Sequence, residues 1–194
     1  MRPTWLRHPI GSTAVLTALL CVAAPASAHR ASGGGDFVLG GPDLTPGRPI
    51  ALSHVYDRGA CRGGNISPTL AWSDPPTATR SFALLMFDSD APGGWWHWLV
   101  FDIPPQTRSL PANAGNPDRH LLPVGALQGR NDYGATGYGG PCPPPGTAHH
   151  YHITLYALRV ATLGLTAGAD GSQIEAKVRA SAIAKAQLTV LYRR

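Results

Sequence analysis

Two apolar runs separated by a short polar turn constrain the fold of this chain more than any other feature. Residues 81–87 read S-F-A-L-L-M-F, and residues 98–103 read W-L-V-F-D-I. Runs of six or seven mostly apolar residues are typical of buried strands. Residues 88–97, between them, carry two carboxylates, a Pro-Gly-Gly turn and a histidine among tryptophans. We therefore expect two rigid strands that aim these polar groups into a pocket.

The composition favours short strands and structured turns over a helical bundle. The 194 residues include 23 glycines and 19 prolines, and charged residues make up 14%. Glycine and proline at this level supply turns and interrupt helices. The chain is long enough for one domain with its own core, and it shows no internal repeat. Further strands are expected at residues 50–55, 68–72, 151–159 and 188–192.

One helix is expected, near the C-terminus. Residues 172–185 begin with Ser172, which suits an N-cap. Ile174, Val178 and Ile183 would form the side of this helix that faces the core.

The first 28 residues have the pattern of a cleaved secretory signal peptide. Arg2 and Arg7 form a basic start, residues 10–24 form an apolar run, and residues 26–28 (A-S-A) fit a cleavage site. A short disordered segment, residues 29–36, would follow in the mature chain. We expect a secreted or periplasmic protein.

Two alternatives exist for this N-terminal segment. The apolar run is only slightly shorter than a membrane span, so an uncleaved anchor is one of them. Lipoprotein processing at Cys21 is the other, although Leu20 precedes that cysteine where a small residue is expected.

The charge gives no sign of a nucleic-acid partner. The formal net charge is +5, and removal of the first 28 residues takes away two arginines and no acid, leaving +3. The remaining arginines are scattered along the chain rather than clustered in a basic run.

Two cysteines remain after the expected cleavage, Cys61 and Cys142. An even number of cysteines in an exported chain suggests a disulfide. Two separate buried thiols are the alternative.

The second informative stretch, residues 130–146, contains five glycines and four prolines. Such a loop holds one shape without regular structure, and its glycines could let main-chain N–H groups form an anion nest. An ordinary surface loop is the alternative. The next expected strand opens with His149, His150, Tyr151 and His152. Strand alternation would place His149 and Tyr151 together on one face, where they could point into a cavity.

Five short motifs in a fixed order resemble the phosphatidylethanolamine-binding protein family, also called Raf kinase inhibitor-like proteins, in its bacterial branch. The similarity extends over almost the whole mature chain, from residue 37 to residue 192. The motifs are N-I-S-P-T-L-A-W at 65–72, D-S-D-A-P at 88–92, W-W-H-W-L-V at 95–100, N-D-Y-G at 131–134, and G-G-P-C-P-P-P-G with H-H-Y within 139–151. The resemblance implies an all-β fold at residues 37–194, a mainly antiparallel β-sandwich with a C-terminal α-helix.

The resemblance also implies a small surface pocket for an anion such as a phosphate or a phospholipid head group. The family turn suggests a cis Ala91–Pro92 bond. This chain differs from its relatives at Ser89, often proline, and at His150, often arginine. Carried over by motif, the ligand-binding residues are Asp88, Asp90, Pro92, His97, Gly140, Pro141, His149 and Tyr151.

Two aspartates beside an anion require an explanation, because like charges repel. We expect Asp88 or Asp90 to accept a hydrogen bond from one imidazole nitrogen of His97 or His149, which favours the histidinium form. The other nitrogen would then donate to the anion. Anion affinity should fall as pH rises and the histidines lose their protons.

We expect a binding protein, not an enzyme, with neither a cofactor nor a metal. There are two alternatives to this function. Two aspartates and two histidines could hold a divalent metal in a hydrolase, but no H-E-x-x-H pair is present. The same surface could inhibit a protease or a kinase, which some family members do. A second copy of the chain, in a homodimer, is a further partner to consider.

Overall fold

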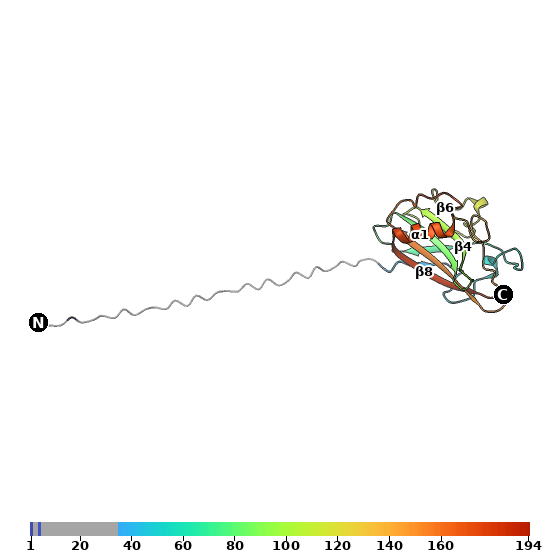
Figure 1. Ribbon diagram of the computed structural model, residues 1–194, viewed down its shortest axis with the longest axis horizontal. Helices are drawn as coiled ribbons and strands as arrows, with labels where there is room; N and C mark the ends of the chain where they lie inside the picture. The colour runs from blue at the N-terminus through green and yellow to red at the C-terminus, as the bar shows by residue number, and fades with distance from the viewer. Residues whose placement is uncertain (2–3, 5–34) are drawn as a thin grey trace. The chain divides into compact units, whose positions relative to one another are not determined.

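The computed structural model describes residues 1, 4 and 35–194. The expected signal peptide, and all but the last two residues of the segment 29–36, lie outside the range 35–194. Residues 35–194 form the domain described below (Figure 1).

Two antiparallel sheets make up most of the fold. The smaller sheet has the strand order β1-β2-β5, and the larger one has the order β6-β4-β3-β7-β8. The strands are β1 (Val38–Gly40), β2 (Leu70–Ser73), β3 (Ser81–Asp88), β4 (Trp95–Ile103), β5 (Ser109–Leu110), β6 (Leu127–Gln128), β7 (His149–Leu158) and β8 (Ala182–Tyr192). One α-helix, α1 (Gly171–Ser181), lies just before β8. The expected antiparallel β-sandwich with a C-terminal helix is confirmed.

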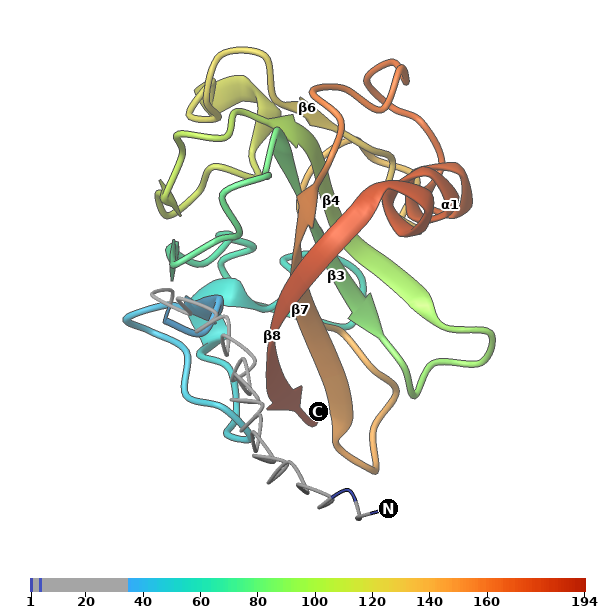
Figure 2. The ribbon, with the colours of Figure 1, turned by 90° about the vertical axis from the view of Figure 1, so that its left-hand side faces the viewer.

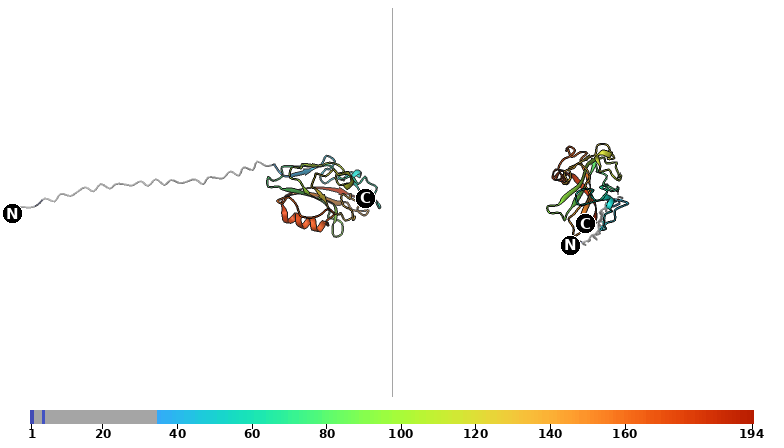
Figure 3. Two further views of the ribbon diagram at one scale, coloured as in Figure 1. Left: turned by 90° about the horizontal axis from the view of Figure 1, so that it is seen from above. Right: turned by 90° about the vertical axis from the view of Figure 1, so that its right-hand side faces the viewer.

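The central strands of the larger sheet are buried on both faces. Figure 3 shows α1 on one side of the folded part and the N-terminal strand on the opposite side. One apolar cluster, which includes Phe82, Leu84 and Trp98, fills the space between the two sheets. A second cluster joins Leu99 and other residues of the opposite face to Ile174 of α1. Because β3 is central and covered on both faces, its sequence is a continuous apolar run rather than an alternating one.

The expected strand at residues 50–55 is wrong. The chain forms a short 3₁₀ helix there, Leu52–His54, and the N–H of His54 donates to the carbonyl of Ala51 at 3.0 Å. Ile50 and Val55 are buried while Leu52 is exposed. The weak alternation of apolar residues therefore reflects packing on either side of a turn. Of residues 50–55, only Ile50 is hydrogen-bonded to a strand, through its N–H to the carbonyl of Leu191 in β8.

The expected helix has the right type and the wrong ends. It starts at Gly171 after the N-cap Asp170 and stops at Ser181, where β8 begins. Residues 182–185 were expected to be helical, but they pair with β7 instead (Figure 2). Long-range pairing thus overrides the local helix preference, and Ile183 is 37% exposed on the strand. The predicted short strand at 188–192 is the second half of β8.

Candidate functional site

Three strands of the larger sheet meet at the motif residues. Asp88 is the last residue of β3, Trp95 is the first of β4, and His149 is the first of β7. Asp88 lies opposite Trp95 in one ladder and opposite Tyr151 in the other. The sheet register therefore gathers residues 61 positions apart at one end of the fold.

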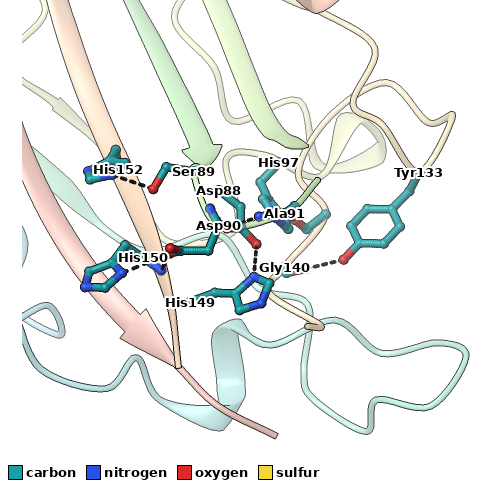
Figure 4. Close-up of polar contacts among 11 residues, drawn as sticks. Asp88, Ser89, Asp90, Ala91, His97, Tyr133, Gly140, His149, His150 and His152 are labelled. Carbon is teal, nitrogen blue, oxygen red and sulfur yellow. Dashed lines mark hydrogen bonds and ion pairs between the residues drawn. The ribbon is translucent and has the colours of Figure 1, made fainter. Parts of the chain in front are cut away.

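Both carboxylate oxygens of Asp88 accept hydrogen bonds at this end of the sheet. Its side chain is only 5% exposed. Oδ1 accepts from the N–H groups of Asp90 at 2.9 Å and Ala91 at 3.3 Å, which fixes the turn. Oδ2 accepts from Nδ1 of His149 at 2.7 Å (Figure 4). The carboxylate thus orients one imidazole, the arrangement expected from the sequence for one of the two histidines.

The turn after Asp88 is also bound to two further histidines of β7. Asp90 Oδ2 accepts from the backbone N–H of His150 at 2.6 Å and from its Nδ1 at 2.9 Å. These bonds, the backbone one first, hold the pKa of Asp90 below its ordinary value. Ser89 Oγ is hydrogen-bonded to Nε2 of His152 at 3.0 Å (Figure 4). Ser89 and Asp90 therefore contact the face of β7 that carries His150 and His152, while Asp88 contacts His149 on the opposite face.

The Ala91–Pro92 bond is trans rather than cis. Two glycines make the reversal instead, since Gly93 and Gly94 have φ angles of +79° and +77°. The N–H of Gly94 closes the turn by donating to the carbonyl of Ala91 at 2.7 Å.

His97 differs from its expected role. Its Nδ1 donates to the carbonyl oxygen of Gly139 at 2.6 Å, not to an aspartate. The residue is 2% exposed, and burial lowers the pKa of the ring to about 4, although the Gly139 carbonyl and the nearby Asp88 oppose this shift. His97 is therefore neutral near pH 7, and the expectation of a histidinium at this position is wrong.

The glycine-rich loop does not form the expected anion nest. The N–H of Gly139 donates to the carbonyl of His97 at 2.9 Å, and the N–H of Gly140 donates to Asn65 Oδ1 at 2.8 Å. The N–H groups of Gly137 and Tyr138 also have backbone acceptors, and the prolines have no N–H to offer. The loop is a rigid wall, tied to the segment around Asn65.

These elements enclose a cavity of about 340 Å³. Five of the eight predicted residues line it: Asp88, Asp90, Pro92, His97 and His149. Gly140 and Pro141 belong to the loop but do not line the cavity; their carbonyls accept from Tyr133 Oη and from the N–H of Tyr56. Tyr151 is fully buried beneath the cavity and packs edge to face against His97, with ring centroids 5.1 Å apart.

Two buried donors next to the cavity have no acceptor among the described residues, Trp95 Nε1 and Tyr151 Oη. Burial, with the nearby Asp88 carboxylate, raises the pKa of the Tyr151 phenol, so it stays protonated. Unpaired buried donors are uncommon in proteins and often mark a functional position.

Six lining residues were not predicted individually. They are Ala91, Trp95, Tyr133, Cys142, Pro143 and Pro144. All six belong to the motifs that carry the family resemblance, so membership of a motif was the available signal. Tyr133 stacks on Tyr56 at 4.0 Å and meets Trp95 edge to face at 5.4 Å. The lining thus combines three prolines, one tryptophan and one tyrosine with two aspartates and two histidines, and it contains no lysine or arginine.

The His, Cys, Asp and Glu side chains of residues 35–194 form no group of three or more with the geometry of a metal site. No helix of this part of the chain has the length and apolarity needed to cross a bilayer.

A two-sheet β-sandwich with a cavity open to solvent at one end of its central strands is an architecture suited to binding a small ligand. A family model for the phosphatidylethanolamine-binding proteins matches residues 41–193. This chain belongs to that family, as its five motifs suggested.

The matches to similar proteins cover most of this chain. UPF0098 protein YbcL of Escherichia coli K12 is 42% identical over 153 residues, covering 77% of this chain and 84% of that protein. UPF0098 protein YbhB of the same organism is 40% identical over 152 residues, covering 77% of this chain and 96% of that protein. The crystal structure of E. coli YbcL, described as a new member of the mammalian PEBP family, matches with a TM-score of 0.80. That structure is 40% identical, and the match covers 82% of this chain and 99% of YbcL.

One relative bears on cellular location. The candidate lipoprotein LppC of Mycobacterium tuberculosis H37Rv is 38% identical over 154 residues, covering 78% of this chain and 70% of that protein.

Proposed function

We propose that this protein binds a small phosphate-like anion, free or as a head group, in the cavity at the end of β3 and β7. The observation that carries the proposal is the pairing of His149 with Asp88. The pair fixes the imidazole with Nδ1 toward the carboxylate, and Nε2 makes no hydrogen bond with any described residue. His149 lines the cavity and its side chain is 14% exposed, so a ligand can reach this ring.

The charge of the lining makes binding dependent on pH. When His149 is protonated, it presents an N–H and a positive charge. No lysine or arginine lines the cavity. When His149 is neutral, Nε2 is a lone pair and two carboxylates, Asp88 and Asp90, also face the cavity. Anion affinity should therefore be lower when His149 is neutral than when it is protonated.

We infer that the protein is a non-catalytic binding protein that acts outside the cytoplasm. The basic start, apolar run and A-S-A sequence of residues 2–28 support export. Cys61 and Cys142, whose Cα atoms lie 6.0 Å apart, are positioned to form a disulfide, which is stable in oxidising compartments.

Calorimetric titration of the purified protein with inorganic phosphate at pH 5.5 and pH 8.0 tests the proposal. We expect tighter binding at pH 5.5. His149→Asn keeps an N–H near the Nδ1 position, facing Asp88, and removes Nε2. Loss of one charge-assisted hydrogen bond, of about 1.5–3 kcal/mol, should weaken phosphate binding about 10- to 100-fold.

The matched control is His120→Asn. His120 is exposed and adopts φ +51°, a conformation that asparagine tolerates. It should bind phosphate like the wild type. Tighter phosphate binding at pH 8.0, or an unchanged affinity in His149→Asn, would overturn the proposal. So would binding of ethylammonium in place of phosphate, because carboxylates and aromatic rings also suit a cation.

A further inference from the structure

β8 is an edge strand of the larger sheet, and its outer side is covered only near the C-terminus. It pairs with β7 on one side, and no other strand of residues 35–194 pairs with it (Figure 2). Near the C-terminus, an extended segment before the 3₁₀ helix takes the outer position. The N–H of Gly47 donates to the carbonyl of Thr189 at 2.8 Å, and the N–H of Ile50 donates to the carbonyl of Leu191 at 2.8 Å. This edge of the sheet therefore already accepts an added segment at one end.

The rest of this side, residues 184–188, is here called the open edge. In an antiparallel strand, alternate residues direct their backbone N–H and C=O groups to opposite neighbours. Because Thr189 and Leu191 direct theirs outward, Gln187 and Lys185 do so too. The backbone groups of these two residues make no hydrogen bond with any described residue. A row of unpaired backbone groups on an edge strand is a template for another extended chain.

The charge beside the open edge favours an acidic partner. The side chains of Lys185 and Gln187 line a groove of about 290 Å³ next to α1. The carboxylate of Glu175 and the guanidinium of Arg179 also line it, and they pair with each other at 2.6 Å. Lys185 forms no ion pair with any described residue, so its positive charge is not balanced within this part of the chain.

A second copy of this chain fits the open edge poorly. Antiparallel pairing of two such edges, centred on Lys185 or Ala186, would place the two Lys185 side chains opposite or diagonal to each other on one face. Like charges in these positions repel, and lysine on an edge strand works against self-association for this reason. A carboxylate from a different chain would be attracted at the same position.

We propose that the open edge of β8 binds an extended acidic segment of another protein as an added antiparallel strand. Lys185 and Gln187 would each bond to it through their N–H and C=O groups, and a carboxylate of the segment would lie beside the Lys185 ammonium. Ile183, which is 37% exposed at the start of this edge, offers an apolar contact to the end of the segment. The groove beside the open edge shares no residue with the cavity of the proposed function.

Three capped five-residue peptides test this inference: T-V-E-V-T, T-V-K-V-T, and T-V-E-V-T with an N-methyl group on the central glutamate. In NMR titrations, T-V-E-V-T should slow hydrogen exchange at the amides of Lys185 and Gln187. It should bind about fivefold tighter than T-V-K-V-T, which is the size expected for a cross-strand charge pair. The N-methylated peptide should not bind, because its central residue cannot donate to the edge.

Two variants separate the charge from the backbone groups. Lys185→Glu should reverse the order of T-V-E-V-T and T-V-K-V-T. Gln187→Pro removes one outward N–H, which an edge strand tolerates, and should weaken T-V-E-V-T at least fivefold. Gln187→Ala is the matched control, because it loses the same side chain and keeps the N–H, so it should bind T-V-E-V-T like the wild type. Phosphate affinity should be the same in all of these variants.

The charge reversal decides the inference even if Gln187→Pro does not fold. Equal binding of T-V-E-V-T and T-V-K-V-T to the wild type would overturn it, as would binding of neither peptide at millimolar concentration. Amides of Lys185 and Gln187 that are already protected in the free monomer would mean that the rest of the chain covers the edge, which also overturns it. A dimer in sedimentation that Gln187→Pro abolishes would assign the edge to a second copy instead.

Discussion

His97 on β4 and Gly139 in the proline-rich loop, 42 residues apart, are joined by a hydrogen bond of 2.6 Å from the imidazole Nδ1 to the carbonyl oxygen. This contact closes the cavity on one side and defines the tautomer of the ring. Because the ring is 2% exposed, it can be protonated only at a large cost in solvation. The burial of His97 against Gly139 therefore makes the free energy of unfolding depend on pH.

The first prediction concerns stability at low pH. The pKa of His97 is about 4 in the folded chain, against 6.5 for an unperturbed histidine. Above pH 6.5 the ring is neutral in both states, so it makes no contribution to the pH dependence. Between pH 6.5 and 4 the unfolded chain binds a proton that the folded chain does not, so the free energy of unfolding should fall as pH falls. The His97 contribution is about 3 kcal/mol at its full extent.

Urea unfolding of the wild type and of His97→Asn between pH 4 and pH 7.5 measures this contribution. The variant should show a flatter profile, because asparagine does not titrate. His120→Asn removes an exposed histidine and should retain the slope of the wild type. Parallel profiles for the wild type and His97→Asn would contradict the assignment.

The sequence identified the long strands and five of the eleven residues that line the cavity, but not how these residues are bonded. Residues 81–87 were readable as a strand because β3 is buried on both faces, so that local composition and tertiary environment agree. The strand conformation of residues 182–185 could not be predicted from the sequence, because it depends on the pairing of β8 with β7. The partner of His97 was also out of reach, since it depends on how a distant loop folds back.

The second prediction concerns Asn65, whose side chain is hydrogen-bonded to the proline-rich loop at Gly140. It adopts φ +51°, and its Oδ1 accepts from the N–H of Gly140 at 2.8 Å. Asn65→Asp keeps both the acceptor and a residue that tolerates this φ, so it should have the smallest effect. Asn65→Gly keeps the φ but loses the acceptor, at a cost of about 1 kcal/mol, and Asn65→Ala loses both, at about 2–3 kcal/mol. Denaturant unfolding should give this order, and an Asn65→Ala variant as stable as Asn65→Gly would show that the φ angle carries no strain.

The third prediction concerns the cysteine pair. A bond between Cys61 and Cys142 would close a loop with a sequence separation of 81 residues. Loops of this length correspond to about 4 kcal/mol in the chain-entropy model, so a reducing agent should lower the melting temperature clearly. The double variant Cys61→Ser with Cys142→Ser should melt at the lower temperature and be insensitive to reductant. Free thiols at both positions in the protein purified without reductant would refute the pairing.

The fourth prediction uses the close approach of two backbones at Gly140. A Cβ atom placed there would collide with the carbonyl oxygen of His54 and the backbone nitrogen of Tyr56. The His54 oxygen already accepts a hydrogen bond from Tyr138 Oη at 2.7 Å, so it is not free to move aside. Gly140→Ala should therefore destabilise the fold by about 2–3 kcal/mol, as overpacking does in a tight core. It should also weaken phosphate binding, because the loop wall would be displaced from His97.

Gly40→Ala is the matched control, since no atom lies within 4 Å of a Cβ at that position in β1. This substitution should change the free energy of unfolding by about 0.5 kcal/mol or less, because the new methyl group meets no neighbour. Equal stability of the two variants would mean that the loop can relax away from residues 54–56 without loss. In that case the rigidity of the wall could not explain how the Gly139 carbonyl is held against His97.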